Sequence, residues 1–251
     1  MKVTTSYPYD FDDSLNRIDE ILNTSSVFED LEEIPSSDKL TYKNGFYLNC
    51  FAIFIDIRHS STLPTKYNRP TLAKIYRAYI SEITAIFQSY EECKEINIVG
   101  DSVWAVFNSK KKIDVLNVFY AACISNSLVN TLNYKLCKKG IEPIEIGIGI
   151  AKGRALMIQA GYKGSALNDV IWMGDVVNQA SKMCSKANKE VSQSLVITDS
   201  VYIDLNGYGN NTAELYQTFF SKKNEYYYAD IVEIGMNNKL IKMQSESPCK
   251  K

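Results

Sequence analysis

Two aspartates of the sequence each lie beside an apolar run of the kind that forms a buried strand. Asp56 directly follows residues 51–55, and Asp101 lies in a Gly-Asp-Ser sequence between the apolar runs of residues 96–107. Taken alone, the Gly-Asp pair indicates a hairpin, with Asp101 a simple turn residue. If the two strands are neighbours, however, the carboxylates converge and repel each other unless a cation lies between them. Magnesium or manganese would suit such a pair.

A polar segment, Arg58-His59-Ser60-Ser61, follows the first of these aspartates. Because it lies after a strand and before helical sequence, we expect its backbone N–H groups to cradle the phosphates of a nucleotide. The segment lacks the glycines that mark most phosphate loops. His59 is the one histidine of the chain. A histidine can act as a base, but we interpret His59 as a polar loop residue beside the phosphates.

Asn178 and Lys182 are four residues apart in a helix predicted from residue 175 to about residue 188. Residues at this spacing share one face of a helix, beside the face on which Ala180 and Cys184 would meet the core. Asp175 begins the helix, and we interpret it as the N-cap.

The elements that position these residues follow from periodicity. Residues 69–90 and 113–136 repeat apolar positions at helical spacing, whereas residues 46–57 and 144–150 read as strands. With the 96–107 hairpin, the order is that of a ferredoxin-like β-α-β-β-α-β core, an α+β fold. Gly147 and Gly149 lie on one face of the last strand, where glycine would let another backbone or a ligand approach closely.

Further elements extend this core at both ends. We predict a short helix at residues 12–23, a linker at 24–40, and a hairpin at Asn44-Gly45 leading into the first core strand. Strands are predicted near residues 155–160, 195–197 and 226–234. The predicted organisation is therefore residues 1–40 as an N-terminal helix and linker, 41–240 as the catalytic domain, and 241–251 as a polar tail, expected to be disordered.

The composition excludes several classes of partner and site. A formal net charge of −1 over 251 residues gives no support for a nucleic-acid partner. The six cysteines show no Cys-x-x-Cys spacing and read as small core residues in a reducing compartment. The N-terminus lacks the apolar stretch of a signal peptide, and no apolar run reaches the length of a membrane span. We expect a cytoplasmic protein with no membrane partner.

Four segments, FIDIRHSSTL, IVGDSVWAVF, IGIGIAKGRA and IWMGDVVNQASKM, occur in this order. Together they resemble the successive motifs of class III nucleotidyl cyclases over roughly residues 46–205. The Arg-His-Ser-Ser continuation and Lys182 look most like the pyrimidine cyclases of bacterial Pycsar antiphage signalling.

The resemblance assigns roles to individual residues. Asp56, Asp101 and the backbone carbonyl of Ile57 match the ligands of two Mg²⁺ or Mn²⁺ ions per active site. Arg154 matches the family's phosphate-binding arginine, although without the resemblance it is as readily an exposed arginine after a turn. Asn178 matches the asparagine that orients the ribose. Lys182 stands where the family usually has an arginine that stabilises charge at the α-phosphate.

Base selection in purine cyclases falls on two positions, a Lys or Glu four residues before the second metal aspartate and a polar residue three before the later Gly-Asp. Those positions here are Asn97 and Ile171, so neither purine pattern is present. Asn97 is expected to read the edge of a pyrimidine, and Ile171 would leave the polar edge of a purine unpaired. Trp172 either fills the remaining pocket or packs in the core.

The resemblance therefore implies a cyclase that converts UTP to 3′,5′-cyclic UMP and pyrophosphate, with CTP to cyclic CMP as the alternative. It implies a head-to-tail homodimer in which Asp56, Asp101 and Arg154 of one chain face Asn178 and Lys182 of the other. The product would activate a separate effector during phage infection.

Two other functions fit parts of the sequence. A catalytically inactive cyclase-like module would bind nucleotide or only dimerise, but both metal aspartates are retained. A palm-type dinucleotide cyclase would share the core, but the chain lacks a Gly-Gly-Asp-Glu-Phe-like turn.

Overall fold

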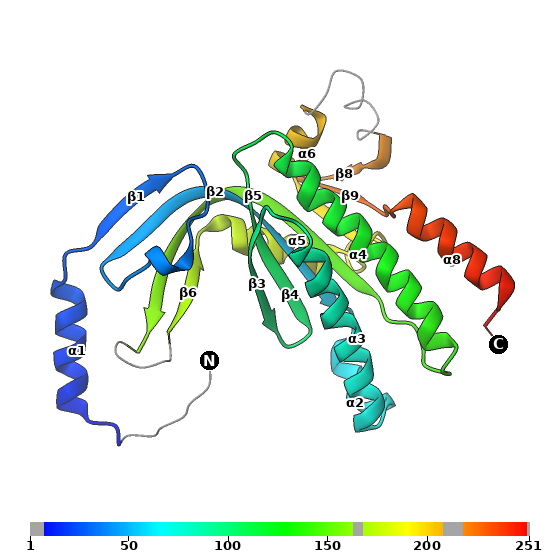
Figure 1. Ribbon diagram of the computed structural model, residues 1–251, viewed down its shortest axis with the longest axis horizontal. Coiled ribbons are helices and arrows are strands. Elements are labelled where there is room, and N and C mark those ends of the chain that lie inside the picture. Colours follow the sequence, from blue (N-terminus) through cyan, green and yellow to red (C-terminus); the bar gives the residue numbers. More distant parts are fainter. Residues whose placement is uncertain (1–7, 163–167, 208–217, 250–251) are drawn as a thin grey trace.

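The computed structural model describes residues 8–162, 168–207 and 218–249, and a single mixed sheet organises them (Figure 1). The sheet order is β3-β4-β2-β5-β7-β9-β8, with β1 pairing β2 and β6 pairing β5. The strands are β1 (Val27–Leu31), β2 (Asn44–Ile57), β3 (Cys93–Val99), β4 (Ser102–Asn108), β5 (Ile146–Gly161), β6 (Asn168–Met173), β7 (Leu195–Thr198), β8 (Ser221–Lys223) and β9 (Tyr226–Ala229). The helices are α1 (Phe11–Asn23), η1 (Ser37–Lys39), η2 (Ser60–Thr62), α2 (Leu63–Lys66), α3 (Arg69–Gln88), α4 (Asp114–Cys137), α5 (Asp175–Lys186), α6 (Asp199–Asn206) and α8 (Ile234–Glu246).

The core predicted from periodicity is confirmed as β2-α3-β3-β4-α4-β5. Alternate residues of β2 face opposite sides of the sheet, because successive side chains of a strand point in opposite directions. Phe51, Ile53 and Ile55 are fully buried against α3 and α4, whereas Cys50 and Ala52 lie in a second apolar cluster with α5. Figure 1 shows α3 and α4 side by side along one face of the sheet.

The N-terminal region differs from its prediction. Strand β1 pairs with β2 in parallel, so Asn44-Gly45 opens β2 and forms no hairpin. Residues 24–40 are likewise more than a linker, because they contain β1 and bury the side chains of Ile34 and Leu40. The helix α1 is confirmed, but none of its residues is buried, and it lies at the edge of the molecule (Figure 1).

The second half of β5 forms an arm with a strand that sequence reasoning missed. The predicted strands at 144–150 and 155–160 are one continuous strand of 16 residues. Strand β6 pairs antiparallel with its second half, with Trp172 opposite Met157 and Ile171 opposite Ile158.

The C-terminal region also departs from the prediction. The expected strand at 226–234 ends at Ala229, and α8 follows, so the proposed boundary at residue 241 falls inside a helix. Residues 241–249 are ordered against α4, where the hydroxyl of Tyr134 donates to the carbonyls of Met243 and Ser247 at 3.0 and 2.8 Å. The expectation of a disordered tail is wrong for these residues, and residues 250–251 lie outside the described chain.

Two further expectations concern cysteines and membranes. Cys137 and Cys249 form a disulfide, so the prediction that every cysteine is a reduced core residue is wrong for this pair. Among the described helices, only α4 has the length and apolar composition that a membrane span requires. Most of its side chains are buried in the fold, as for Val118 and Ala121, so α4 is a core helix here.

Candidate active site

Asp56 and Asp101 converge at one end of the sheet, as their sequence positions predict. Asp56 is the penultimate residue of β2, and Asp101 lies in the β3–β4 turn, where Gly100 adopts a φ of +65° that favours glycine. The two strands are paired, with Ile55 opposite Val103. Burial, and then the neighbouring carboxylate of Asp101, raise the pKa of Asp56 to about 6. Oδ2 of Asp101 is buried and has no hydrogen-bond partner.

This pair fits a hard divalent cation. Two carboxylates that repel each other and an unpartnered carboxylate oxygen are the features that a cation would relieve. No third His, Cys, Asp or Glu joins them within the part of the chain that the structure describes. Further ligands would come from backbone and substrate oxygens, which is usual for Mg²⁺. The side chain of Ile57 is apolar and buried, so only its backbone carbonyl oxygen can serve as a metal ligand.

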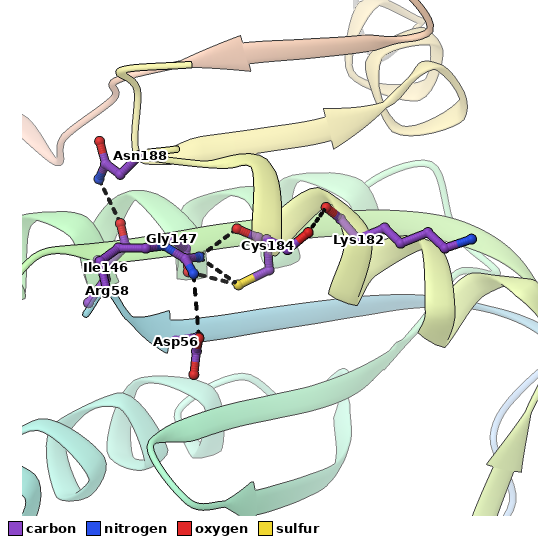
Figure 2. Close-up of polar contacts among 8 residues, drawn as sticks. Asp56, Arg58, Ile146, Gly147, Lys182, Cys184 and Asn188 are labelled. Atoms are coloured by element: carbon purple, nitrogen blue, oxygen red, sulfur yellow. Dashed lines mark hydrogen bonds and ion pairs between the residues drawn. The ribbon is translucent and has the colours of Figure 1, made fainter. Parts of the chain in front are cut away.

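Arg58 does not lie in an exposed phosphate-binding segment, contrary to the prediction from its sequence position. Its side chain is only 2% exposed and turns inward, beneath the C-terminal end of α5 (Figure 2). Its backbone N–H donates to the carbonyl of Glu145 at 2.7 Å and is therefore not free to bind a phosphate. The predicted phosphate-binding role of Arg58 is wrong in this structure, because both its backbone and its guanidinium are engaged by its own chain.

The rest of the predicted phosphate segment lies at the surface. His59 has a φ of 54° and precedes η2, which contains Ser60 and Ser61. Ser61 and His59 are exposed, and Ser60 is half-buried. These residues are accessible beside Asp56, and their part in phosphate binding stays a prediction.

Helix α5 presents the two other predicted catalytic residues on its outer side. Ala180 and Cys184 are buried beneath it, whereas Asn178 and Lys182 are exposed. Asp175 lies in the first turn but is not the N-cap, which is Gly174 with a φ of 146°. In Figure 2 the Lys182 side chain extends away from Asp56. One chain therefore does not bring Lys182 to the paired carboxylates.

Arg154 is separated from Asp56 within the chain. In the β2–β5 register Arg154 is opposite Asn49, whereas Asp56 is opposite Gly147, seven positions along the strand. At about 3.3 Å per residue the two sites are roughly 23 Å apart, and the odd spacing puts them on opposite sheet faces. Arg154 instead pairs with Asp30 and lies 4.5 Å from the centre of the Tyr47 ring. The prediction that it shares a half-site with Asp56 is wrong for this chain.

The predicted base-reading residues also diverge. Asn97 lines a surface pocket of ≈ 540 Å³ together with Lys94, Glu95 and Val170. Ile171 is 39% exposed, and the alternation of β6 turns it away from buried Trp172. The structure therefore does not bring Ile171 to Asn97. Of the two alternatives for Trp172, the core position is confirmed, because it packs in the cluster beneath α5.

Glu95 is a residue that sequence reasoning missed. Its carboxylate accepts hydrogen bonds from Nδ2 of Asn97 and Nε1 of Trp172, each at 2.9 Å. A sequence signal existed, because Glu95 and Asn97 are two residues apart in a strand and therefore lie on the same face of β3. Asn97 and Phe54 are each opposite Trp104, so this cluster shares a sheet face with Asp56.

Comparison with known proteins identifies the family of this chain. The model of the adenylate and guanylate cyclase catalytic domain matches residues 44–227. The chain therefore belongs to the class III nucleotidyl cyclases, a family that generally uses divalent metal ions. A protein named uridylate cyclase from Gulbenkiania mobilis is 45% identical over 233 residues, which cover 89% of this chain and 90% of the relative.

Two further relatives extend the comparison. A uridylate cyclase from Treponema porcinum is 35% identical over 231 residues, covering 92% of this chain and 80% of the relative. The crystal structure of the adenylyl cyclase CyaB from P. aeruginosa has a TM-score of 0.61 at 18% identity. The matched region covers 76% of this chain and 97% of the CyaB chain. At this identity the likeness concerns the fold alone.

Proposed function

We propose that this protein converts UTP to 3′,5′-cyclic UMP and pyrophosphate. The observation that carries a cyclase reaction is the convergence of Asp56 and Asp101, with an unpartnered buried oxygen between strand ends. The choice of a pyrimidine rests on the two relatives named uridylate cyclase and on Asn97, where purine cyclases have Lys or Glu.

In the proposed reaction a bond forms between the ribose O3′ and the α-phosphorus, and the bond from that phosphorus to the pyrophosphate oxygen breaks. The 3′-hydroxyl proton leaves to solvent. Asp56, Asp101 and the carbonyl of Ile57 would hold two Mg²⁺ or Mn²⁺ ions, whose chemistry is to acidify the hydroxyl and to neutralise the triphosphate.

The exposed polar residues of α5 have the remaining roles. The Asn178 amide can donate to and accept from the ribose and so orient O3′ for attack. The Lys182 ammonium would stabilise negative charge at the α-phosphate as a point charge, without the fork of an arginine. Arg154 would have to leave Asp30 to reach a triphosphate, so we give it no step.

The geometry of one chain favours a site shared by two chains. Lys182 points away from Asp56 in its own chain. Asp56 belongs to β2 and Lys182 to α5, and the last turn of α5 lies between the two side chains (Figure 2). A head-to-tail homodimer would place Asp56 and Asp101 of one chain opposite Asn178 and Lys182 of the other. Exposed apolar side chains at the tip of β3, Ile98 at 52% and Val99 at 68%, would be covered in such a dimer.

The cellular role that we propose follows from the resemblance alone. The enzyme would act in the cytoplasm, and its product would be read by a separate effector protein in antiphage signalling.

The decisive experiment incubates the purified protein with each of the four ribonucleoside triphosphates and Mn²⁺ and identifies products by mass spectrometry. Cyclic UMP as the main product would support the proposal. Cyclic CMP as the main product would replace UTP by CTP, and cyclic purine nucleotides would refute the pyrimidine assignment. A protein that binds UTP without turnover would instead be an inactive module.

A further inference from the structure

Arg58 is a buried cation held between the metal-site strand and helix α5. Its Nη1 lies 3.4 Å from Oδ2 of Asp56, and its Nη2 donates to the backbone carbonyl of Cys184 at 2.5 Å. The same Nη2 lies 3.3 Å from Sγ of Cys184. One planar guanidinium therefore contacts a predicted metal ligand and the last turn of the helix that carries Lys182 (Figure 2).

Two glycines of β5 make this arrangement possible. A Cβ atom on Gly147 would lie 1.6 Å from Nη2 of Arg58, so the guanidinium lies directly on the strand backbone. A Cβ atom on Gly149 would lie 2.0 Å from the backbone nitrogen of Cys184, so α5 packs on the next glycine of the same face. The thiol of Cys184 donates to the carbonyl of Gly147 at 3.1 Å and closes the cluster.

The cluster is not built as a simple stabilising ion pair. Burying a charge is costly unless it is fully paired, and buried ion pairs are often no better for stability than apolar groups of similar size. Nε of Arg58 is buried and has no hydrogen-bond partner, and the contact with Asp56 is long for a salt bridge. What the guanidinium supplies is geometry, because its fork reaches a carboxylate and a helix carbonyl at once.

A second contact holds the same end of α5 without touching Asp56. Asn188, with a φ of 49°, donates from Nδ2 to the carbonyl of Ile146 at 2.7 Å. The end of α5 is therefore anchored twice, by Arg58 at the end of β2 and by Asn188 on β5 (Figure 2). Only the Arg58 anchor extends to the metal site.

We propose that Arg58 is a positioning residue for the cyclase reaction, which orients Asp56 for metal binding and fixes the end of α5, and does not bind substrate phosphate. This inference rests on the proposed function. In a shared dimer site, Asp56 and α5 of one chain serve different active sites. Because Arg58 contacts both, it would couple the positions of residues in the two active sites of the dimer.

The first test compares Arg58→Lys with Asn188→Gly, which removes the other anchor and keeps a residue suited to the positive φ. Mn²⁺ binding to the nucleotide-free protein is measured by electron paramagnetic resonance, and kcat and KM for UTP are measured at saturating Mn²⁺. Arg58→Lys should weaken Mn²⁺ binding and lower kcat by about 10- to 100-fold while KM for UTP is unchanged. Asn188→Gly should leave Mn²⁺ binding unchanged.

Hydrogen exchange of the nucleotide-free protein gives a readout that does not require turnover. Both variants should accelerate exchange in peptides covering residues 184–190, because both release the end of α5. A raised KM for UTP with unchanged kcat and Mn²⁺ binding would show that Arg58 binds substrate and would overturn the inference. Equal Mn²⁺ binding in all three proteins would overturn it as well.

The second test moves the guanidinium without changing it. Gly147→Ala would displace Arg58 and should reproduce the loss of Mn²⁺ affinity seen in Arg58→Lys. Gly153→Ala is the matched control on the same face of β5, because its Cβ would lie 3.3 Å from Cβ of Val176 and far from Arg58. Its Mn²⁺ affinity should equal that of the wild type, and equal losses in both variants would refute the specific role of Arg58. If the wild type cyclised no UTP but Mn²⁺ binding followed this pattern, the proposed substrate would fail and the positioning role would stand.

Discussion

Asn97 donates a 2.9 Å hydrogen bond through Nδ2 to Oε1 of Glu95, two residues earlier on β3. A carboxylate only accepts hydrogen bonds, so this contact requires the amide nitrogen and fixes which end of the Asn97 side chain faces Glu95. Trp172 holds Glu95 from the other side through its indole N–H. The sequence left both orientations of the amide open, whereas the structure selects one.

A fixed amide can distinguish uracil from cytosine, because the two bases exchange donor and acceptor at adjacent ring positions. Glu95→Gln should remove this discrimination. A glutamine amide can accept or donate a hydrogen bond, so the Asn97 side-chain amide could adopt either of its two orientations. We expect the ratio of kcat/KM for UTP to that for CTP to fall about tenfold, or about 1.4 kcal/mol, with little change in metal dependence. Glu91→Gln, an exposed change just before β3, is the control. An unchanged ratio in Glu95→Gln would show that the orientation of Asn97 is not read.

The paired carboxylates should be required for turnover but not for folding. Asp56→Asn or Asp101→Asn should lower kcat by more than about 100-fold, because each removes one of the two carboxylates that the described residues bring together here. Circular dichroism should show an unchanged fold. Asp19→Asn, an exposed aspartate on α1, serves as the control. Near wild-type activity at saturating Mn²⁺ in either variant would contradict the metal assignment.

The raised pKa of Asp56, about 6 against 3.8, predicts how stability depends on pH. A carboxyl with a raised folded-state pKa binds more protons in the folded than in the unfolded protein. The free energy of unfolding of the metal-free protein therefore falls as pH rises from about 4 to about 6, and the cost persists above pH 6. Asp56→Asn should lack this loss and gain on the order of 1 kcal/mol over wild type between pH 4 and 7.5, allowing for solvent screening of a side chain 34% exposed.

Urea denaturation in the presence of EDTA at both pH values measures this difference. Mn²⁺ at pH 7.5 should stabilise the wild type and not the variant. Parallel pH profiles for the two proteins would mean that neither burial nor Asp101 raises the pKa of Asp56 in the folded protein.

The parts of the fold that could be predicted are those with local signals. Helices α3 and α4 and strand β2 repeat apolar residues over many positions, so their periodicity is clear without any knowledge of neighbours. Strand β1 has no buried residue and pairs in parallel with β2, a non-local contact that Val-Phe-Glu-Asp-Leu does not encode. Helix α8 buries only Leu240 fully, so its polar sequence resembles a tail.

The site divides in the same way. Asp56 and Asp101 were predicted from strand ends, because a charge after an apolar run must lie at the exit of the strand. The inward turn of Arg58 depends on Gly147, which lies on a strand 89 residues later and pairs with Asp56. The two alternating glycines were the signal of a close approach, and the structure shows what approaches: a guanidinium and a helix backbone.

The docking of α8 leads to a stability prediction. Leu240 is 6% exposed and the adjacent Ile241 is 54% exposed. Leu240→Ala should lower the free energy of unfolding by roughly 2 kcal/mol, because it leaves a cavity, whereas Ile241→Ala should cost less than about 0.5 kcal/mol. Denaturant titration of both variants measures the difference. Equal small effects would mean that α8 does not pack stably on α4.

The shared active site gives the last prediction. Lys182 points away from Asp56 within one chain, so Asp101→Ala and Lys182→Ala should each be inactive alone and should complement each other when mixed (Figure 2). A mixed dimer contains one site with the carboxylates of the Lys182→Ala chain and the helix α5 of the Asp101→Ala chain, both intact. Because random exchange makes about half of the dimers mixed, with one good site of two, activity should recover to about a quarter of wild type. Differently tagged chains, co-purified, give the fraction of mixed dimers independently. Mixed dimers without activity would place Asp101 and Lys182 in the same site of one chain, against the direction in which the Lys182 side chain extends.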